Sequence, residues 1–275
     1  INEWLRPLSW LYGLGVGFRN MLFEIGVFKS RAYDIPVIAV GNITVGGSGK
    51  TPHVEYLVNL LHDKLKVAVL SRGYKRKSRG YVLADKDTTM PMIGDEPFQM
   101  KSKYNDIYDA FQHRYVKPGI NILLVDYHRL IIYDELLPAG HLREPKEGKR
   151  RADMVIITKC PKDLKPMEFR VLTRAMDLFP YQDLFFTTLN YKQPKGIFNN
   201  KELPLTDIAK DTTIMVLTGI ASPQQMMLDL QPYGKSLVPM SFGDHHNFSH
   251  ADIEQINSRF ASLPSPRIVI TTEKD

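Results

Sequence analysis

The residues that most clearly indicate chemistry form a glycine-rich loop that ends in Gly-Lys-Thr. The loop is Gly41-Asn42-Ile43-Thr44-Val45-Gly46-Gly47-Ser48-Gly49-Lys50-Thr51. Glycines in such a loop let successive backbone N–H groups converge on an anion at the N-terminus of a helix. Lys50 would contact the β- and γ-phosphates of a nucleotide, and the Thr51 hydroxyl would bind Mg²⁺. The loop therefore predicts a nucleoside triphosphate site whose binding residues run from Thr44 to Thr51.

The elements beside the loop support this interpretation. The apolar run 35–40 predicts a buried strand before the loop, and helically spaced apolar residues over 54–61 predict a helix after it. This strand–loop–helix context distinguishes a phosphate-binding loop from a chance match. Thr44 stands where the usual motif has its first glycine, and we expect Gly46 and Gly47 to supply the flexibility instead. The alternative is a tight strand-to-helix turn that binds nothing.

Short apolar runs alternate with helical patterns along most of the chain. The runs are Lys66–Ser71, Asn121–Tyr127, Met154–Thr158, Thr213–Thr218 and Arg267–Thr272. The alternation predicts an α/β fold like that of the P-loop NTPases, with a mostly parallel sheet flanked by helices. Ligands bind at the carboxyl ends of such strands, where Gly41, Ser71, Asp126 and Thr158 fall.

Changes in this pattern divide the chain into four parts. A helical segment rich in aromatic residues covers 1–28, and the phosphate-loop domain covers 29–184. Alternating Thr, Asn, Tyr and Phe residues predict a β-hairpin linker over 185–206. A smaller α/β domain over 207–275 completes the predicted organisation.

The spacing of the chain is unusual between Tyr104 and Asp109, where there is too little sequence for the strand that the pattern leads us to expect. We therefore expect an internal stretch to be missing there. The first residue is Ile1 rather than methionine, and no covering helix follows the strand at 267–272. We accordingly expect further residues before Ile1 and a tail after Asp275.

Composition narrows the class of protein. The chain has 275 residues, a net charge of +6 and one cysteine, Cys160, so a disulfide framework and a multi-cysteine metal site are excluded. We expect Cys160 to be a bystander at a strand end rather than a nucleophile. The basic clusters over 72–79 and 149–151 suit phosphates or an anionic membrane surface, or else are solvated loops. No pattern typical of nucleic-acid binding accompanies them, so we expect no nucleic-acid partner.

The N-terminal segment carries both tryptophans and many other apolar residues. Its longest uncharged stretch, 7–18, is shorter than the roughly 20 apolar residues that span a bilayer. No small-residue cleavage site follows it, which argues against a secretory signal. Flanking Arg6, Arg19 and Lys29 suit a helix that lies in the membrane interface. A core helix packed on the sheet is the other interpretation, and the sequence leaves both open.

Short motifs along nearly the whole chain form an ordered set. They are Pro7-Leu8-Ser9-Trp10-Leu11-Tyr12, the loop Gly41–Thr51 with Pro52, Ser71-Arg72-Gly73-Tyr74, Gly94-Asp95-Glu96-Pro97, Asp109-Ala110-Phe111-Gln112-His113, Leu137-Pro138-Ala139-Gly140, Leu142-Arg143-Glu144, Asp244-His245-His246 and Thr272-Glu273-Lys274-Asp275. Each motif alone is weak, but the ordered set closely resembles the tetraacyldisaccharide 4′-kinase family of lipid A synthesis. Thr44 is itself typical of that family's loop. The chain departs from the family in having Tyr108-Asp109 where the family has paired aspartates, and in stopping at its last motif.

The resemblance implies transfer of the γ-phosphoryl group of ATP to the 4′-hydroxyl group of a tetraacylated glucosamine disaccharide 1-phosphate. Lys50 would act on the transferred phosphoryl group. A sugar hydroxyl needs a positioned base to take its proton, and we expect Asp95 in this role. His245 or His246 would orient the Asp95 carboxylate or relay its proton. Without the resemblance, 94–97 is best interpreted as a helix N-terminus whose acids favour the helix dipole.

The resemblance also suggests metal and nucleotide contacts. ATP and Mg²⁺ are the expected cofactors, with Thr51, Asp109 and Glu144 organising the metal and Arg143 holding the nucleotide. Arg143 and Glu144 suit the lipid headgroup equally, and the sequence does not separate these roles. The expected partners are the acylated disaccharide lipid and a membrane surface, with no obligatory protein partner. The protein would then be peripheral on the inner leaflet, at the cytoplasmic face of the bacterial inner membrane.

Two other classes of protein compete with the kinase. The first is a membrane-associated P-loop NTPase switch, because Thr158-Lys159-Cys160-Pro161 resembles a guanine-reading Thr-Lys-x-Asp motif. Pro161, however, replaces the aspartate that would read the base. The second is a non-catalytic membrane scaffold with a relic loop, and the intact Lys50, Thr51 and Asp95 argue against it.

Overall fold

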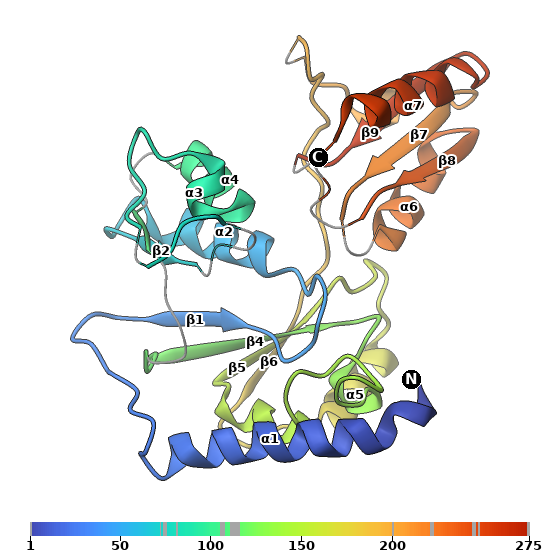
Figure 1. Cartoon of the computed structure of the whole chain (residues 1–275). Coiled ribbons are helices and arrows are strands. Elements are labelled where there is room, and N and C mark those ends of the chain that lie inside the picture. The colour runs from blue at the N-terminus through green and yellow to red at the C-terminus, as the bar shows by residue number, and fades with distance from the viewer. Residues whose placement is uncertain are drawn as a thin grey trace. The chain divides into compact units, whose positions relative to one another are not determined.

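The computed structural model describes residues 2–71, 73, 76–80, 82–104, 116–199, 201–220, 223–243, 246 and 248–273, and the backbone alone of 108–110. The chain forms two compact units, Ile1–Thr188 and Leu189–Asp275 (Figure 1). The division falls inside the predicted linker 185–206. Each unit is an α/β structure in which all pairings between the named strands are parallel.

The first unit is built on a four-stranded sheet in the order β1-β4-β5-β6. Its strands are β1 (Ile38–Gly41), β4 (Ile120–Asp126), β5 (Met154–Thr158) and β6 (Asp183–Phe186). The register pairs Gly41 with Leu123 and Asp126 with Thr158. Three of the predicted strand ends, Gly41, Asp126 and Thr158, therefore meet at one edge of the sheet, as parallel pairing requires.

Helices cover both faces of this sheet. The helix α2 (Lys50–Leu61) lies on one face, and α5 (Pro166–Met176) lies on the other (Figure 1). Leu172 and Met176 of α5 pack in a core cluster with buried residues of β4 and β5. The central strands are buried on both faces, which is why they appear in the sequence as continuous apolar runs rather than alternating ones.

A second, two-stranded sheet in this unit joins β2 (Ala68–Leu70) to β3 (Tyr108–Ala110), with Val69 opposite Asp109. The predicted run 66–71 is thus a strand, but it does not belong to the four-stranded sheet. The short helix α3 (Met90–Ile93) and the longer α4 (Asp95–Lys103) precede β3. Two 3₁₀ helices, Ile131–Tyr133 and Lys146–Arg151, complete this unit together with the N-terminal helices.

The second unit has a three-stranded sheet in the order β8-β7-β9. Its elements are β7 (Thr213–Thr218), α6 (Gln224–Leu230), β8 (Ser236–Ser241), α7 (His250–Ala261), β9 (Arg267–Thr271) and the 3₁₀ helices Leu205–Asp207 and Gln231–Tyr233. Before them, Lys195 and Glu202 form an antiparallel bridge within the predicted hairpin linker.

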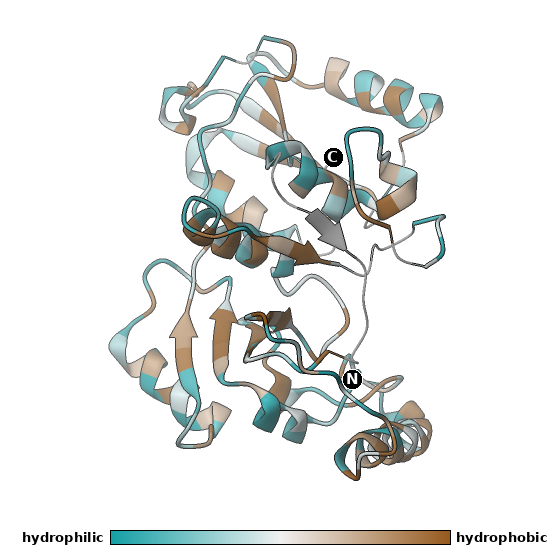
Figure 2. Ribbon diagram, turned by 90° about the vertical axis from the view of Figure 1, so that its left-hand side faces the viewer, coloured by the Kyte–Doolittle hydropathy of each residue, from teal (hydrophilic) through white to brown (hydrophobic). Residues whose placement is uncertain are grey.

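The N-terminal helix α1 (Arg6–Glu24), preceded by a 3₁₀ turn at Glu3–Leu5, leaves most of its apolar side chains exposed. Only Ser9 and Val16 of α1 are buried, and hydrophobic residues dominate the helix (Figure 2). Exposed apolar side chains run through and beyond it: Trp4, Leu8, Trp10, Leu11, Leu14, Phe18, Met21, Ile25 and Val27. None of the described helices is long and apolar enough to cross a membrane. The exposure favours the interfacial interpretation over that of a core helix.

Polar contacts hold α1 against the first unit. Ser9 Oγ donates to the carbonyl oxygen of Leu136 at 2.9 Å and accepts from the backbone N–H of Ala139 at 2.9 Å. Arg6 pairs with Glu135 at 2.9 Å. These contacts fix one side of the helix, while most of its apolar side chains remain exposed.

Candidate active site

The phosphate-binding loop connects β1 to α2, as the sequence predicts. Gly46 has φ of 96° and Gly49 has φ of 83°, in the left-handed region that favours glycine. A Cβ atom at Gly46 would lie 2.8 Å from Nη2 of Arg129. Thr44 is buried, and its hydroxyl accepts a hydrogen bond from Asn42 Nδ2 at 3.3 Å. The conformational freedom thus comes from Gly46 rather than from position 44.

A short backbone pairing brings Arg143 to this loop. The N–H of Val45 donates to the carbonyl oxygen of His141 at 2.8 Å, and the N–H of Arg143 donates to that of Ile43 at 2.7 Å. The first half of the loop is therefore fixed to the segment that carries Arg143, which lies far away in sequence.

Lys50 is partly buried at the start of α2, and its Nζ donates to Asn42 Oδ1 at 3.2 Å. Burial lowers the pKa of Lys50, the charge of Glu96 opposes that shift, and the charge of Arg143 adds to it. Lys50, Glu96 and Arg143 therefore lie within electrostatic reach of one another. A bound phosphate would supply the negative charge that two neighbouring cations favour.

Two adjacent acids, Asp95 and Glu96, begin α4, and Glu96 contacts the end of the phosphate loop. Thr51 Oγ1 donates to Glu96 Oε1 at 2.9 Å, and the N–H of Glu96 donates to Asp95 Oδ1 at 2.9 Å. The turn into α4 uses Gly94 at φ of 95°. Asp95 thus lies at the N-terminus of a helix, as the simpler interpretation predicts, and directly precedes the residue that contacts Thr51. Sequence reasoning missed Glu96, although it lies in the same motif as Asp95.

The arrangement suits a magnesium ion. The Thr51 hydroxyl and the Glu96 carboxylate are hard oxygen ligands, and Mg²⁺ in phosphoryl-transfer sites takes only one or two protein ligands beside water and phosphate oxygens. Within the part of the chain that the structure describes, no three His, Cys, Asp or Glu side chains gather into a metal-binding group. Asp109 lies in β3, and its side chain is outside the described residues.

Glu144 was predicted as a metal ligand, and the structure gives it cationic neighbours. Its carboxylate forms salt bridges with Arg151 and with Arg19 of α1, the latter at 3.5 Å. The side chain is only 11% exposed. A metal role for Glu144 therefore stays a prediction, and its visible contacts connect α1 to the segment that follows Arg143.

The two candidate histidines belong to the second unit. His246 Nε2 is 3.1 Å from Asp252 Oδ2, and the ring stacks on Phe242. Hydrogen bonds from Ser249 and His246 lower the pKa of Asp252 to about 2, so this carboxylate is an ionised partner for the ring. His245 lies outside the described residues. The action of either histidine on Asp95 stays a prediction.

Cys160 is buried, and burial raises the pKa of its thiol to about 11. A thiol with a raised pKa is a poor nucleophile at neutral pH because little thiolate forms. The geometry agrees with the bystander role expected for it.

Comparison with protein families gives a match over the whole chain. The model of a family described as tetraacyldisaccharide-1-P 4′-kinase matches residues 1–108 and 106–275. A Phocaeicola vulgatus protein named tetraacyldisaccharide 4′-kinase is 55% identical over 306 residues, covering 100% of this chain and 84% of its own. The protein of the same name from Flavobacterium johnsoniae is 40% identical over 302 residues, covering 100% and 86%.

A solved structure has the same fold. The crystal structure described as an "apo" form of LpxK from Aquifex aeolicus in complex with ATP has a TM-score of 0.69 and is 29% identical. The likeness covers 98% of this chain and 88% of that one. It confirms the predicted fold class of a P-loop kinase with mostly parallel sheets flanked by helices.

Proposed function

The chain belongs to the tetraacyldisaccharide-1-P 4′-kinase family, and from this premise we propose that it moves the γ-phosphoryl group of ATP to the 4′-hydroxyl group of a tetraacyl glucosamine disaccharide 1-phosphate. The predictions that the chain belongs to this family and that it is a kinase are confirmed by these matches. The observation that carries the residue-level proposal is the contact between Thr51 and Glu96. It joins the phosphate loop to the motif that supplies the candidate base.

The nucleotide is held from several sides. Backbone amides between Thr44 and Lys50 would bind the phosphates, and the Lys50 ammonium group would stabilise charge on the transferred phosphoryl group. Arg143, brought to the loop by backbone pairing, adds a second cation. When bound, Mg²⁺ would neutralise charge on the phosphates, and Thr51 and Glu96 would be its protein ligands.

Asp95 is the proposed base for the acceptor hydroxyl. Asp95 directly precedes Glu96, whose carboxylate contacts Thr51 at the end of the loop, and this proximity supports the proposal. Asp95 would accept the hydroxyl proton as the oxygen attacks. A histidine of the second unit, His245 or His246, is proposed to orient this carboxylate. Asp109 and Glu144 remain the proposed further contributors to the metal site.

Substitution of Glu96 tests the metal assignment. Glu96→Gln keeps the shape of the side chain and removes its charge, so we expect ATP binding to need on the order of ten times more Mg²⁺ and kcat to fall about 10- to 100-fold. Titration of ATP binding against Mg²⁺, measured without lipid, gives a readout that is separate from catalysis. Glu254→Gln on α7 is the matched control and should match the wild type. An unchanged Mg²⁺ requirement in Glu96→Gln would remove Glu96 from the metal site.

The acceptor carries four acyl chains, so the enzyme must reach it at a membrane. Burial of each CH₂ group contributes about 0.8 kcal/mol, which keeps such a lipid in the bilayer. The exposed apolar residues of α1 and of the 3₁₀ turn before it are the proposed contact, with Trp4 94% and Trp10 73% exposed. The basic residues Arg19 and Lys29 at the edges of this segment would face anionic headgroups. This proposal makes the protein peripheral on the inner leaflet of the bacterial inner membrane.

Acidic substitutions on α1 test this contact. Trp10→Glu with Leu14→Glu should reduce co-sedimentation with anionic vesicles about tenfold or more, because apolar area is lost and two negative charges are added that an anionic surface repels. The melting temperature should stay near that of the wild type, since both side chains are exposed. Leu228→Glu with Ile253→Glu, which changes two exposed apolar residues of the second unit, is the control. Full sedimentation of the α1 variant would contradict the proposal.

The nucleotide switch remains the alternative function. A switch would hydrolyse nucleotide without a lipid acceptor and would prefer GTP, whereas the kinase should consume ATP in proportion to the acceptor supplied. Pro161 occupies the position of the base-reading aspartate, so we expect no preference for GTP. Measuring ADP and GDP release with and without the lipid distinguishes the two.

A further inference from the structure

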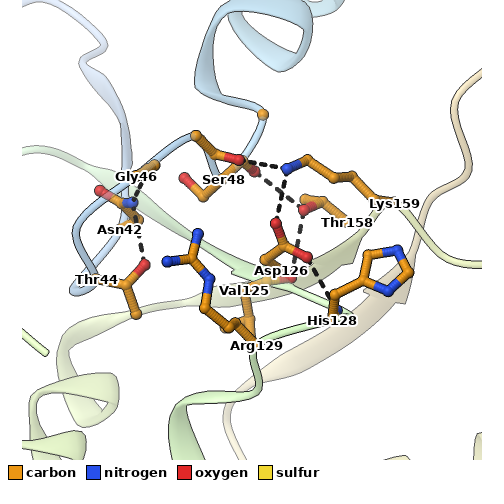
Figure 3. Close-up of polar contacts among 12 residues, drawn as sticks. Asn42, Thr44, Gly46, Ser48, Val125, Asp126, His128, Arg129, Thr158 and Lys159 are labelled. Atoms are coloured by element: carbon orange, nitrogen blue, oxygen red, sulfur yellow. Dashed lines mark hydrogen bonds and ion pairs between the residues drawn. The ribbon is translucent and has the colours of Figure 1, made fainter. Parts of the chain in front are cut away.

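Lys159 directly follows β5 and has unusual surroundings. Its side chain is 10% exposed, and its Nζ lies 2.7 Å from Asp126 Oδ2 (Figure 3). The same ammonium group donates to the carbonyl oxygen of Gly47 in the phosphate loop. The backbone of Lys159 has φ of 58°, which non-glycine residues rarely adopt. Such a conformation persists where the surrounding structure over-determines it, and it is found disproportionately at functional sites.

The contact with Gly47 is one of three that hold successive carbonyl groups of the loop. Thr158 Oγ1 donates to the carbonyl oxygen of Ser48 at 3.0 Å. His53 Nδ1 lies 2.7 Å from the carbonyl oxygen of Gly49. The carbonyl groups of Gly47 and Ser48 are therefore held by residues at the end of β5. The carbonyl group of Gly49 is held by the helix that follows the loop.

These contacts set the direction of the loop amides. In a planar trans peptide the C=O and the following N–H point in opposite directions. A contact that draws the carbonyl of Gly47 toward the end of β5 therefore turns the N–H of Ser48 the other way. The hydrogen bond to the carbonyl of Ser48 does the same to the N–H of Gly49. Amides turned outward at a helix N-terminus are the groups that bind phosphate.

Asp126 balances the charge of Lys159. It ends β4, the strand beside β1, and its Oδ1 accepts a hydrogen bond from the N–H of His128 at 2.9 Å (Figure 3). Its side chain is 4% exposed. Removing two charges from water costs more than a buried pair usually returns, so stability alone is a weak reason to keep one. What the pair of Asp126 and Lys159 does provide is an ammonium group in contact with the phosphate loop.

We propose that Lys159 is a positioning residue for nucleotide binding. It holds the Gly47 carbonyl toward the end of β5 so that the neighbouring amides face the phosphates of ATP, and Asp126 pairs with its ammonium group and keeps it in place. The inference rests on the proposed function in so far as ATP is the ligand of this loop. It also gives the Thr158–Pro161 motif a role that does not involve reading a nucleobase.

The test separates positioning from stability. Lys159→Met keeps the length of the side chain and removes the charge, but it leaves Asp126 buried and unpaired. Adding Asp126→Asn removes that uncompensated charge. We expect Lys159→Met to lower the melting temperature, and the double variant to recover much of the loss. Binding of MgATP, measured by calorimetry without lipid, should be weaker by on the order of tenfold or more in both variants, because a charge-assisted hydrogen bond to the loop is lost.

Lys162→Met, an exposed lysine three residues further on, is the matched control and should bind MgATP as the wild type does. Thr158→Val removes the neighbouring anchor without any change of charge and should weaken MgATP binding several-fold. The inference is overturned if the double variant, or Thr158→Val where the double variant does not fold, binds MgATP within twofold of the wild type. A wild-type protein that binds no MgATP would instead overturn the proposed function.

Discussion

Lys50→Ala is expected to lower kcat by about three orders of magnitude, because it removes the cation closest to the charge that develops on the transferred phosphoryl group. Lys50 lies at the first residue of α2, and its ammonium group contacts Asn42 rather than an acid. Its substitution therefore leaves no carboxylate without a direct salt-bridge partner. Alanine also favours the helix, so the variant should fold.

The measurement is single-turnover phosphoryl transfer, together with the melting temperature and MgATP binding. Lys64→Ala, an exposed lysine just after α2, is the control and should keep wild-type kcat. The melting temperature of Lys50→Ala should stay near that of the wild type. Near-normal turnover in Lys50→Ala would contradict the assignment of the phosphate loop.

Asp95→Asn is expected to reduce kcat about 10²- to 10⁴-fold, because the amide cannot accept the proton of the attacking hydroxyl. The substitution preserves shape, and the amide oxygen can still accept the hydrogen bond from the N–H of Glu96 that now reaches Asp95 Oδ1. The start of α4 should therefore be retained. The dissociation constant for MgATP should change only a few-fold, since Asp95 acts on the acceptor.

Comparing kcat with the Michaelis constants separates the roles of this carboxylate. Asp87→Asn, an exposed acid in the turn before α3, serves as the control and should leave both unchanged. A change confined to the Michaelis constant for ATP, with kcat intact, would move Asp95 out of the catalytic role and into nucleotide binding.

Much of the fold was predictable because its central strands are buried on both faces. Met154–Thr158 and Thr213–Thr218 are strands with the predicted bounds. The strand β8 was not predicted from the sequence, and its Pro239 argues against a strand. The structure shows why that proline is tolerated, since β8 is at the edge of its sheet. The helix α5, which begins with Pro166 at its first helical position, was not predicted from the sequence either.

The candidate site was predictable as far as local motifs reach. The loop from Thr44 to Thr51 depends on a contiguous pattern, so its position follows from sequence alone. The contact between Thr51 and Glu96 joins segments 45 residues apart. The local sequence does not show which of the adjacent acids, Asp95 or Glu96, reaches the Thr51 hydroxyl. The role inferred for Lys159 depends on β4 lying beside β5, which is a property of the sheet order.

The central claim is transfer of a phosphoryl group from ATP to a lipid hydroxyl, and the direct measurement is the product itself. The purified protein is incubated with ATP labelled at the γ-phosphate, Mg²⁺ and a tetraacyl glucosamine disaccharide 1-phosphate in mixed micelles, and the lipid is analysed by mass spectrometry with fragmentation. We predict one labelled phosphate at the 4′ position for each ADP released, and no labelled lipid with Lys50→Ala over the same time. Release of ADP that is independent of the lipid, with no label at the 4′ position, would contradict the account.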